Sequence, residues 1–302
     1  MKILAATAAC TRRMMSSEQD YDTIAFWIEM IQKVTGIDGY YLYLNDIEIS
    51  RRSELFCLSE EAGIDYDYQD LGFSPDNRSN SAREPSRPRE PTRDNKSRTE
   101  AIPGREYERF VVTRNPVIEY ALKNNYDYLF NVDSDVICRP YTVERLLVRM
   151  KPGVAMAAVL VNNLARYISR DKVNIFRIPE PSFKWNVCDL ISTPGRSPFI
   201  KHTQVKKNTV MDVDISGACC IIDLEPFKKH GIKYECDRNG EDANICGKLK
   251  KLGYKIILDT ADDLECLHLQ ELWIMQNEQL INSYLRGERP DYFKFRKNVG
   301  GT

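Results

Sequence analysis

The sequence predicts an α/β fold, because strand patterns and helix patterns alternate along most of the chain. Near the N-terminus, the apolar run at residues 2–7 (KILAAT) indicates a short buried strand. Residues 21–36 (YDTIAFWIEMIQKVTG) have the spacing of an amphipathic helix that Gly36 ends, and residues 38–46 (DGYYLYLND) indicate a second strand. Strand, helix and strand in close succession are typical of a parallel unit in an α/β sheet.

The same alternation continues in the later part of the chain. Residues 108–136 predict a strand, a helix with Pro116 in its first turn, and a hydrophobic strand that ends at the sequence DSD. The other predicted elements are a helix at 142–150, a strand at 153–161, a strand, glycine break, strand and helix at 209–231, a helix and strand at 240–260, and a last helix at 271–287.

Residues 74–105 interrupt this pattern. The segment has five prolines, many serines and arginines, and no large aliphatic residue before Ile102. Such a composition cannot bury enough apolar surface to offset its ordering entropy, so we expect a disordered surface insertion. Positions 76 to 105 contain eight Lys or Arg residues and five Asp or Glu residues. This excess of positive charge is compatible either with a solvated linker or with contact to a polyanion.

Composition limits the function classes. The formal net charge is −1, so no field of the whole protein attracts nucleic acid or an anionic membrane. Nine scattered cysteines without a CxxC pair argue against a zinc knuckle or redox motif and favour a reducing compartment. The opening MKILAATAAC is too short an apolar run for a signal peptide, and no stretch approaches the ~20 apolar residues of a membrane span. We therefore expect a cytoplasmic protein.

Two aspartates, Asp133 and Asp135, follow the predicted strand YDYLFNV. Buried carboxylates are costly unless a positive group compensates them, so the pair indicates either an exposed acidic turn or a bound cation. Residues i and i+2 of a strand face the same way, so both carboxylates can hold one hard divalent ion that also binds phosphate oxygens and water. The carboxyl ends of strands are also where open α/β sheets bind ligands.

A second acidic pair, Glu241 and Asp242, begins the helix predicted after Gly240. Helical spacing puts Asp242 on the same face as apolar residues three, four and seven positions later. We therefore expect its carboxylate on the buried side of the first turn, where it could serve as a catalytic base. Glu241 either takes part in the same chemistry or simply complements the positive end of the helix dipole.

His268 is the histidine best placed for chemistry. His202 falls in a polar loop and His230 at a predicted helix end, whereas His268 follows a predicted strand after a short loop. An imidazole can be the third protein ligand beside two carboxylates. The alternative is a core histidine packed between its two flanking leucines.

Six segments, taken in order, carry a resemblance to a known family. They are KILAAT, TRNPVIEYAL, the strand that ends in DSD, the glycine-broken pair DVDISGACCII, GEDANICGKLKKLGYKIILDT and the late LHL. Together they resemble the GT-A glycosyltransferases, in particular the family-2-type enzymes. The resemblance implies the GT-A fold of nucleotide-diphospho-sugar transferases, a Rossmann-like, mixed central sheet flanked by helices. It also implies one catalytic domain over residues 1–270, interrupted by the insertion at 74–105, and a C-terminal helix and basic aromatic tail at 271–302.

The function implied by this resemblance is metal-dependent transfer of a hexosyl or pentosyl group. The donor would be a nucleotide-diphosphate sugar and the acceptor a hydroxyl, with inversion at the transferred sugar. Asp133 and Asp135 resemble the DxD motif that binds a divalent metal (Mn²⁺ or Mg²⁺) with the donor's ribose and diphosphate, and His268 resembles a late metal-binding histidine. Such an ion would stabilise the negative charge that develops on the departing diphosphate.

The remaining residues implied by the resemblance belong to the acceptor and the nucleotide. Asp242 resembles the base that deprotonates the acceptor hydroxyl, which is a weak nucleophile until a carboxylate takes its proton, and Glu241 stands beside it. Thr7, in the turn after the first strand, would lie against the nucleotide base. Arg114 would lie near the diphosphate.

Other functions fit parts of the sequence. A haloacid-dehalogenase-like phosphohydrolase also uses a strand that ends in DxD, and ADDLE with Lys255 resembles its later motifs. However, the residues after the DSD do not fit its flexible turn, and GEDANICGKLKKLGY has no role in it. A nucleotidyltransferase would need a glycine-rich loop where ATAACTRRMMSS has no glycine. A binding module without catalysis would not need an acid at Asp242.

The sequence leaves the acceptor open among a glycan, a lipid-linked precursor, a protein side chain and a modified nucleobase. Trp185 and the basic aromatic stretch at 177–207 are candidates for its site, because ring faces stack on sugars and on bases. The basic tail, interleaved with Tyr292 and Phe293, either folds over the diphosphate or stays solvated.

Overall fold

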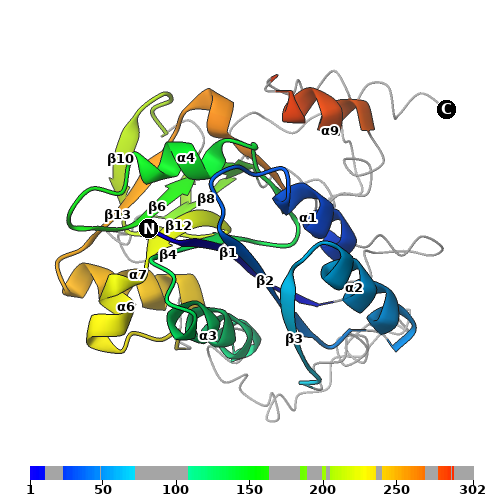
Figure 1. Ribbon diagram of the computed structural model, residues 1–302. Helices are drawn as coiled ribbons and strands as arrows, with labels where there is room; N and C mark the ends of the chain where they lie inside the picture. Colours follow the sequence, from blue (N-terminus) through cyan, green and yellow to red (C-terminus); the bar gives the residue numbers. More distant parts are fainter. Residues whose placement is uncertain are drawn as a thin grey trace, which may run out of the picture.

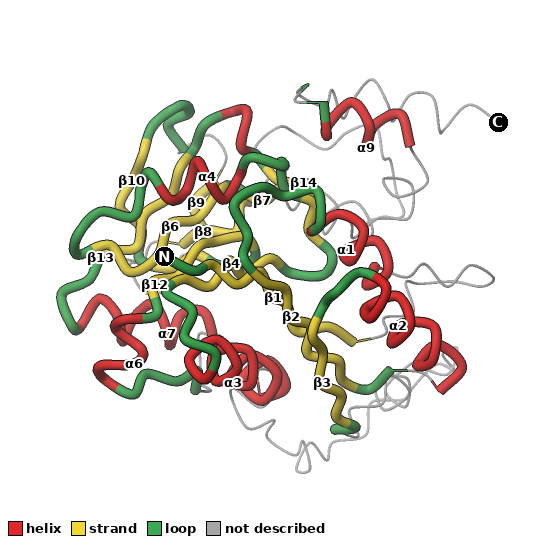
Figure 2. The backbone as a smooth tube through the Cα atoms, in the orientation of Figure 1, coloured by secondary structure: helices red, strands yellow, loops and turns green. Residues whose placement is uncertain are grey.

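The computed structural model describes residues 1–10, 23–47, 49–71, 108–162, 184–188, 199–201, 205–235, 240–268, 278–286 and 288. Within these residues, a large mixed sheet lies between two layers of helices (Figure 1). The strands of the sheet cross the centre of the molecule, as the tube in Figure 2 shows. This arrangement confirms the predicted fold class, a mixed central sheet flanked by helices.

Eight strands of the described residues form the main sheet. In spatial order they are β10 (Val210–Val213), β13 (Lys255–Asp259), β6 (Val154–Val159), β12 (Cys219–Asp223), β4 (Tyr128–Val132), β1 (Ile3–Cys10), β2 (Gly39–Asn45) and β3 (Asp65–Gln69). β1 is parallel to β2 and β4, whereas β12 is antiparallel to both β4 and β6. The carboxyl ends of β1, β2 and β4 therefore meet at one edge of the sheet.

A smaller sheet continues from that edge. Its described strands are β11 (Ile215–Ser216), β8 (Lys184–Cys188), β7 (Val161–Asn162), β14 (Cys266–His268) and β5 (Val136–Ile137), with β9 (Phe199–Lys201) paired to β8. β5 follows β4 in the chain and is antiparallel to β14. This pairing places the main chain of His268 opposite Val136.

Helices cover both faces of the main sheet. One face carries α3 (Glu108–Lys123), α6 (Glu225–His230) and α7 (Glu241–Lys251), and the other carries α1 (Thr23–Ile31), α2 (Ile49–Glu61) and α4 (Thr142–Leu147) (Figure 1). A short 3₁₀ helix, η5 (Asp262–Leu264), precedes β14, and α9 (Glu278–Leu285) follows it. Leu4 and Ala6 of β1 belong to the first core, and Ile3 and Ala5 to the second, as the two-residue period of a strand requires.

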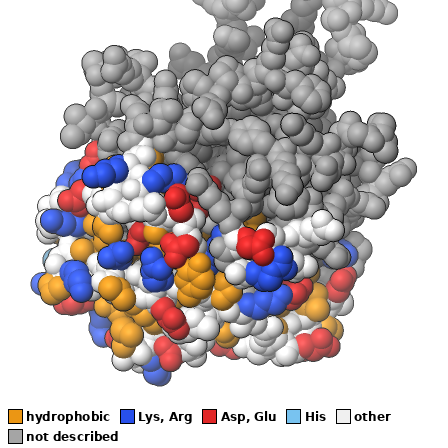
Figure 3. Space-filling model, turned by 90° about the horizontal axis from the view of Figure 1, so that it is seen from above, with side chains coloured by type: hydrophobic (Ala, Val, Ile, Leu, Met, Phe, Trp, Pro, Cys, Tyr) orange, Lys and Arg blue, Asp and Glu red, His pale blue; other side chains and the backbone are white. Residues whose placement is uncertain are grey.

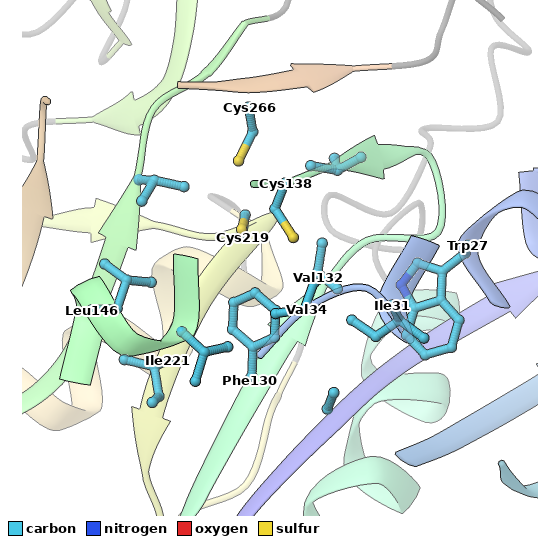
Figure 4. Packing of buried hydrophobic residues seen from close by; sticks show 14 of the residues in the cluster. Trp27, Ile31, Val34, Phe130, Val132, Cys138, Leu146, Cys219, Ile221 and Cys266 are labelled. Atoms are coloured by element: carbon cyan, nitrogen blue, oxygen red, sulfur yellow. The ribbon is translucent and has the colours of Figure 1, made fainter. Parts of the chain in front are cut away.

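Three cysteines lie together in the core on the α1 and α4 side. Figure 4 shows Cys138, Cys219 and Cys266 above Phe130, and each cysteine is at most 2% exposed. Burial raises the pKa of the Cys219 and Cys266 thiols, so they stay protonated and pack as small apolar groups. Six cysteines in the described part of the chain are free thiols and form no disulfide: Cys57, Cys138, Cys219, Cys220, Cys246 and Cys266.

Residues 108–112 correct one sequence prediction. They were expected to form a strand, but they are the start of α3, so Pro116 lies inside this helix and not in its first turn. The β-branched valines favour a strand locally, but packing of Val117, Ile118 and Ala121 on the sheet favours one continuous helix, and tertiary packing outweighs propensity. Pro116 removes one helical hydrogen bond, which the packed helix tolerates.

α2 and β3 are elements that the pattern did not predict. β3 (DYDYQ) lies at the edge of the main sheet and alternates acidic or polar residues with tyrosine. Tyr66 stacks on Phe56 of α2 with ring centroids 4.9 Å apart, so aromatic contact supplies the packing that aliphatic residues supply elsewhere. The predicted insertion at 74–105 lies outside the described residues.

Charged side chains of both signs are interspersed over the face seen in Figure 3, in keeping with the net charge of −1. None of the helices in the described ranges has the combined length and apolar character that crossing a bilayer requires.

Candidate active site

A small pocket lies where β4 ends, between the main sheet and α3. Its walls come from β1, α3, β4 and the turn after β4, and they consist of Ala8, Phe110, Thr113, Arg114, Asn131, Asp133, Ser134 and Asp135. The fold therefore brings the predicted aspartates together with the predicted Arg114. The pocket is at the carboxyl end of parallel strands, as expected for a ligand site in an α/β sheet.

The two aspartates lie in a turn between β4 and β5, and not on a strand as predicted. The N–H of Asp133 donates to the carbonyl of Ala218 at 2.8 Å, and the N–H of Val136 donates to the carbonyl of Asp133 at 2.9 Å. Asp135 is 5% exposed, and the side chain of Asp133 is 31% exposed. Both residues nevertheless line the same pocket.

Arg114 links the two acidic pairs. Its Nη2 donates to Oδ1 of Asp133 at 3.2 Å, its Nε lies 3.7 Å from Oε1 of Glu241, and its Nη1 lies 3.9 Å from Oδ1 of Asp242. Burial acts to lower the pKa of Arg114, but the carboxylates of Asp242 and Asp133 raise this pKa well above its usual value. A permanent cation thus lies among three acidic side chains, one from the turn after β4 and two from the start of α7.

Glu241 and Asp242 begin α7, but their burial is the reverse of the prediction. Glu241 is 7% exposed, whereas the side chain of Asp242 is 32% exposed. Glu241 stands one helical turn before Ile245 and so extends the stripe that packs on the sheet.

The protonation of Glu241 is also unusual. Burial and the neighbouring Asp242 raise the pKa of Glu241 to about 7, although Arg114 acts to lower it. A carboxyl group that exchanges a proton near neutral pH, beside a more exposed carboxylate, is suited to acid–base chemistry.

Gly217 makes room for Asp242. A Cβ atom at Gly217 would lie 2.4 Å from Oδ2 and 2.7 Å from Cγ of Asp242. The predicted glycine break between β11 and β12 therefore allows the carboxylate to rest against the main chain. Any larger residue at this position would displace Asp242.

Asn115 fixes the segment that leads to α7. Its Nδ2 donates to the carbonyl of Tyr234 at 3.0 Å, and its Oδ1 accepts from the N–H of Tyr234 at 2.9 Å. The Tyr234 ring is buried, with its centroid 5.8 Å from the guanidinium carbon of Arg114. The neighbouring Arg114 and Asn115 thus contact the acidic site and the chain that precedes it.

Thr7 does not lie in the turn where it was predicted. β1 extends to Cys10, and Thr7 is 1% exposed inside it. The strand is longer than predicted because the alanines after Thr7 continue the pairing with β2. Ala8 lines the pocket in its place, and the predicted turn lies outside the described residues.

His268 ends β14, and its main chain lies opposite Val136, the residue after Asp135. Its side chain is outside what the structure describes. In the described parts of the chain, no group of three or more His, Cys, Asp or Glu side chains is arranged to hold a metal ion. Two carboxylates and the Ser134 hydroxyl nevertheless offer the hard oxygen ligands that Mg²⁺ and Mn²⁺ prefer.

The phosphohydrolase alternative finds no support in the position of Lys255. This lysine begins β13, is exposed, and lies 3.9 Å from Asp212. β13 runs in the same direction as β4, because β6 is parallel to β13 and both β6 and β4 are antiparallel to β12. Lys255 is therefore at the opposite edge of the sheet from Asp133.

Sequence reasoning missed three residues of the site. Asn131 was detectable, because it lies on the predicted strand two positions before Asp133. Asn115 follows Arg114 in the sequence, but its bonds to Tyr234 join residues distant in the chain. The role of Gly217 was visible only as a break between strands.

No family model matches this chain, and no curated protein matches it. Solved structures of low similarity include S. aureus TarS (TM-score 0.45, 11% identity, 89% of this chain and 36% of that chain) and A197 from STIV (0.39, 12%, 85% and 81%). A third is 4-diphosphocytidyl-2C-methyl-D-erythritolsynthase from Anaerococcus prevotii (0.40, 11%, 94% and 95%). The chain thus spans only 36% of the TarS chain.

Proposed function

We propose that the protein is a metal-dependent glycosyltransferase. It would move a hexosyl or pentosyl group from a nucleotide-diphosphate sugar to an acceptor hydroxyl, with inversion. The observation that carries this proposal is the convergence of two acidic pairs on Arg114, with Asp133 on one side and Glu241 and Asp242 on the other. One pair suits a cation with a diphosphate, and the other suits removal of a proton from the acceptor.

On the donor side, Asp133, Ser134 and Asp135 would hold Mn²⁺ or Mg²⁺, with His268 as a further ligand. The ion would neutralise charge on the departing diphosphate. Arg114 lines the same pocket and adds a positive charge that does not depend on pH over the physiological range. The nucleotide would lie toward the carboxyl end of β1, where Ala8 lines the pocket. Thr7, the residue before Ala8, would then support the site only as part of the strand and would not contact the nucleotide base.

On the acceptor side, Asp242 would accept the proton of the attacking hydroxyl. Its side chain is the more exposed of the acidic pair, and Gly217 lets it rest in one position against the main chain. The acceptor oxygen would then form its bond to the anomeric carbon as the bond to the diphosphate breaks on the opposite face. Glu241 is buried beside Asp242, and its protonation would determine whether the acidic pair carries one negative charge or two.

The wider assignments follow the same hypothesis. Residues 1–270 would form the catalytic domain, with 74–105 as an insertion and 271–302 as a C-terminal helix and tail. The reaction would take place in the cytoplasm. The acceptor stays open among a glycan, a lipid-linked precursor, a protein side chain and a modified nucleobase.

The test is turnover of UDP-, GDP- and dTDP-sugars with Mn²⁺ or with a chelator, and a CMP-sugar serves as the monophosphate control. We expect metal-dependent hydrolysis or transfer with one diphosphate donor, reduced by about 10²- to 10⁴-fold in Asp242→Asn. Asp212→Asn, an exposed aspartate that pairs with Lys255 away from the pocket, is the matched control and should keep the wild-type rate. If none of the donors is turned over in a metal-dependent way, the proposal is wrong.

A further inference from the structure

Asn131 has an unpaired amide in the wall of the candidate site. It lies on β4 between the strands β1 and β12, opposite Ala6 and Cys220, so its main chain is held on both sides. The residue is 6% exposed, and its Nδ2 has no hydrogen-bond acceptor in the described part of the chain. It lines the same pocket as Arg114 and Asp133.

A buried amide without an acceptor lowers the stability of the fold, because folding removes its hydrogen bonds to water and no hydrogen bond within the protein replaces them. The same fold gives the amide nitrogen of another buried asparagine an acceptor. Asn45 is 2% exposed, and its Nδ2 donates to the carbonyl of Ala9 at 2.9 Å. The contrast indicates that the hydrogen-bond acceptor for the Asn131 amide is supplied by a bound ligand and not by the chain itself.

The pocket identifies the chemistry of that partner. Its α3 and β4 walls present N–H donors, from the Arg114 guanidinium and the Asn131 amide, and its turn presents carboxylates. An occupant must therefore offer acceptor oxygens to one wall and a cation to the other. A metal-bound phosphate has both features.

We propose that Asn131 is a further donor-binding residue whose Nδ2 donates a hydrogen bond to a phosphate oxygen of the bound nucleotide. This inference rests on the proposed function. Nδ2 is buried, so a phosphate oxygen would reach it only through movement of pocket side chains, and Arg114 would be released to move if a cation replaced it at Asp133. A sugar hydroxyl oxygen is the other source of the same acceptor chemistry, and the experiment separates the two.

The test compares wild type, Asn131→Leu and Asn45→Leu by calorimetric titration with three probes in Mn²⁺: pyrophosphate, UDP and uridine. Thermal stability is measured in parallel. We expect Asn131→Leu to keep or raise Tm, because leucine has a similar volume and no unpaired donor, and to weaken pyrophosphate and UDP binding by about tenfold or more. Asn45→Leu should lower Tm and leave both affinities unchanged. Asn131→Val, whose β-branched side chain suits a strand, replaces the leucine variant if that one does not fold.

Three results would overturn the proposal. Unchanged pyrophosphate binding with weakened uridine binding would assign the contact to a hydroxyl oxygen. A lowered Tm with unchanged binding of every probe would make Asn131 a structural residue like Asn45. If wild type itself binds neither UDP nor pyrophosphate, the proposed function fails first, and that outcome is recognisable without any variant.

Discussion

Replacing Gly217 with alanine adds one methyl group where the structure has no room for it. The new Cβ atom would lie 2.4 Å from Oδ2 of Asp242, whereas ordinary contacts begin at 3.4 Å. The carboxylate must therefore move by about 1 Å, and a displacement of this size costs about 10²-fold in the rate of a positioned reaction. The effect on stability should be small, because the side chain of Asp242 is 32% exposed and its Oδ1 lies as far as 3.9 Å from Nη1 of Arg114.

The assay is the initial rate of metal-dependent sugar release at saturating donor, together with Tm and the affinity for the nucleoside diphosphate. We expect Gly217→Ala to lower kcat by about 100-fold and to leave the affinity almost unchanged, because the donor pocket does not include Gly217. Gly247→Ala is the matched control. Among the described residues, a Cβ atom at Gly247, inside α7, would meet nothing within 4 Å beyond its chain neighbours and its own helix backbone. This variant should therefore keep its rate and gain about 0.5–1 kcal/mol from helix propensity.

A Gly217→Ala enzyme that keeps a rate within about threefold of wild type would refute the reasoning, provided that its structure shows Asp242 displaced. Asp242 would then not be the base. A fall in Tm as large as the fall in activity would instead identify Gly217 as a folding requirement of the β11 and β12 connection.

Two further predictions concern protonation and the C-terminal helix. Because burial raises the pKa of Glu241 from 4.5 to about 7, the folded state binds its proton more tightly, and the free energy of unfolding should fall as pH rises through this interval. Glu241→Gln removes this fall, so in denaturant titrations the free energy of unfolding of the variant should rise relative to wild type by up to about 3 kcal/mol between pH 4.5 and pH 8. A difference between the two proteins that does not change with pH would contradict the raised pKa. The Tyr284 ring covers the buried guanidinium of Arg139 at 3.6 Å, and its hydroxyl lies 3.2 Å from the carbonyl of Ile137 and 2.8 Å from that of Glu265. We therefore expect a loss of about 1 kcal/mol in Tyr284→Phe and about 3 kcal/mol in Tyr284→Leu, and equal losses would show that the ring over Arg139 contributes nothing.

The central strands of the sheet were predictable because each is a continuous apolar run. β4, β6, β12 and β13 are buried on both faces, and such strands carry their signal in composition alone. β3 gave no such signal because it is at an edge and packs through tyrosines. The start of α3 was misassigned because its valines favour a strand, and only packing on the sheet makes it helical.

The candidate site was predictable in its parts but not in its connections. Local patterns placed Asp133 and Asp135 after the buried strand β4 and Asp242 in the first turn of α7. The three ion pairs of Arg114, and the exchange of burial between Glu241 and Asp242, depend on how α3 and α7 meet the sheet, which no local pattern encodes. The metal role of His268 remains a prediction, supported so far only by its main-chain position beside the turn.

The most direct measurement is calorimetric titration of UDP, GDP and dTDP into the protein, with Mn²⁺ and with a chelator. Asp135→Asn removes one carboxylate of the turn, and Asp127→Asn changes an exposed aspartate at the opposite end of the same strand. We predict that wild type and Asp127→Asn bind one of these nucleotides only with Mn²⁺, and that Asp135→Asn binds it at least about tenfold more weakly. Equal affinity in chelator, or wild-type affinity in Asp135→Asn, would contradict a metal-dependent nucleotide-sugar site at this turn.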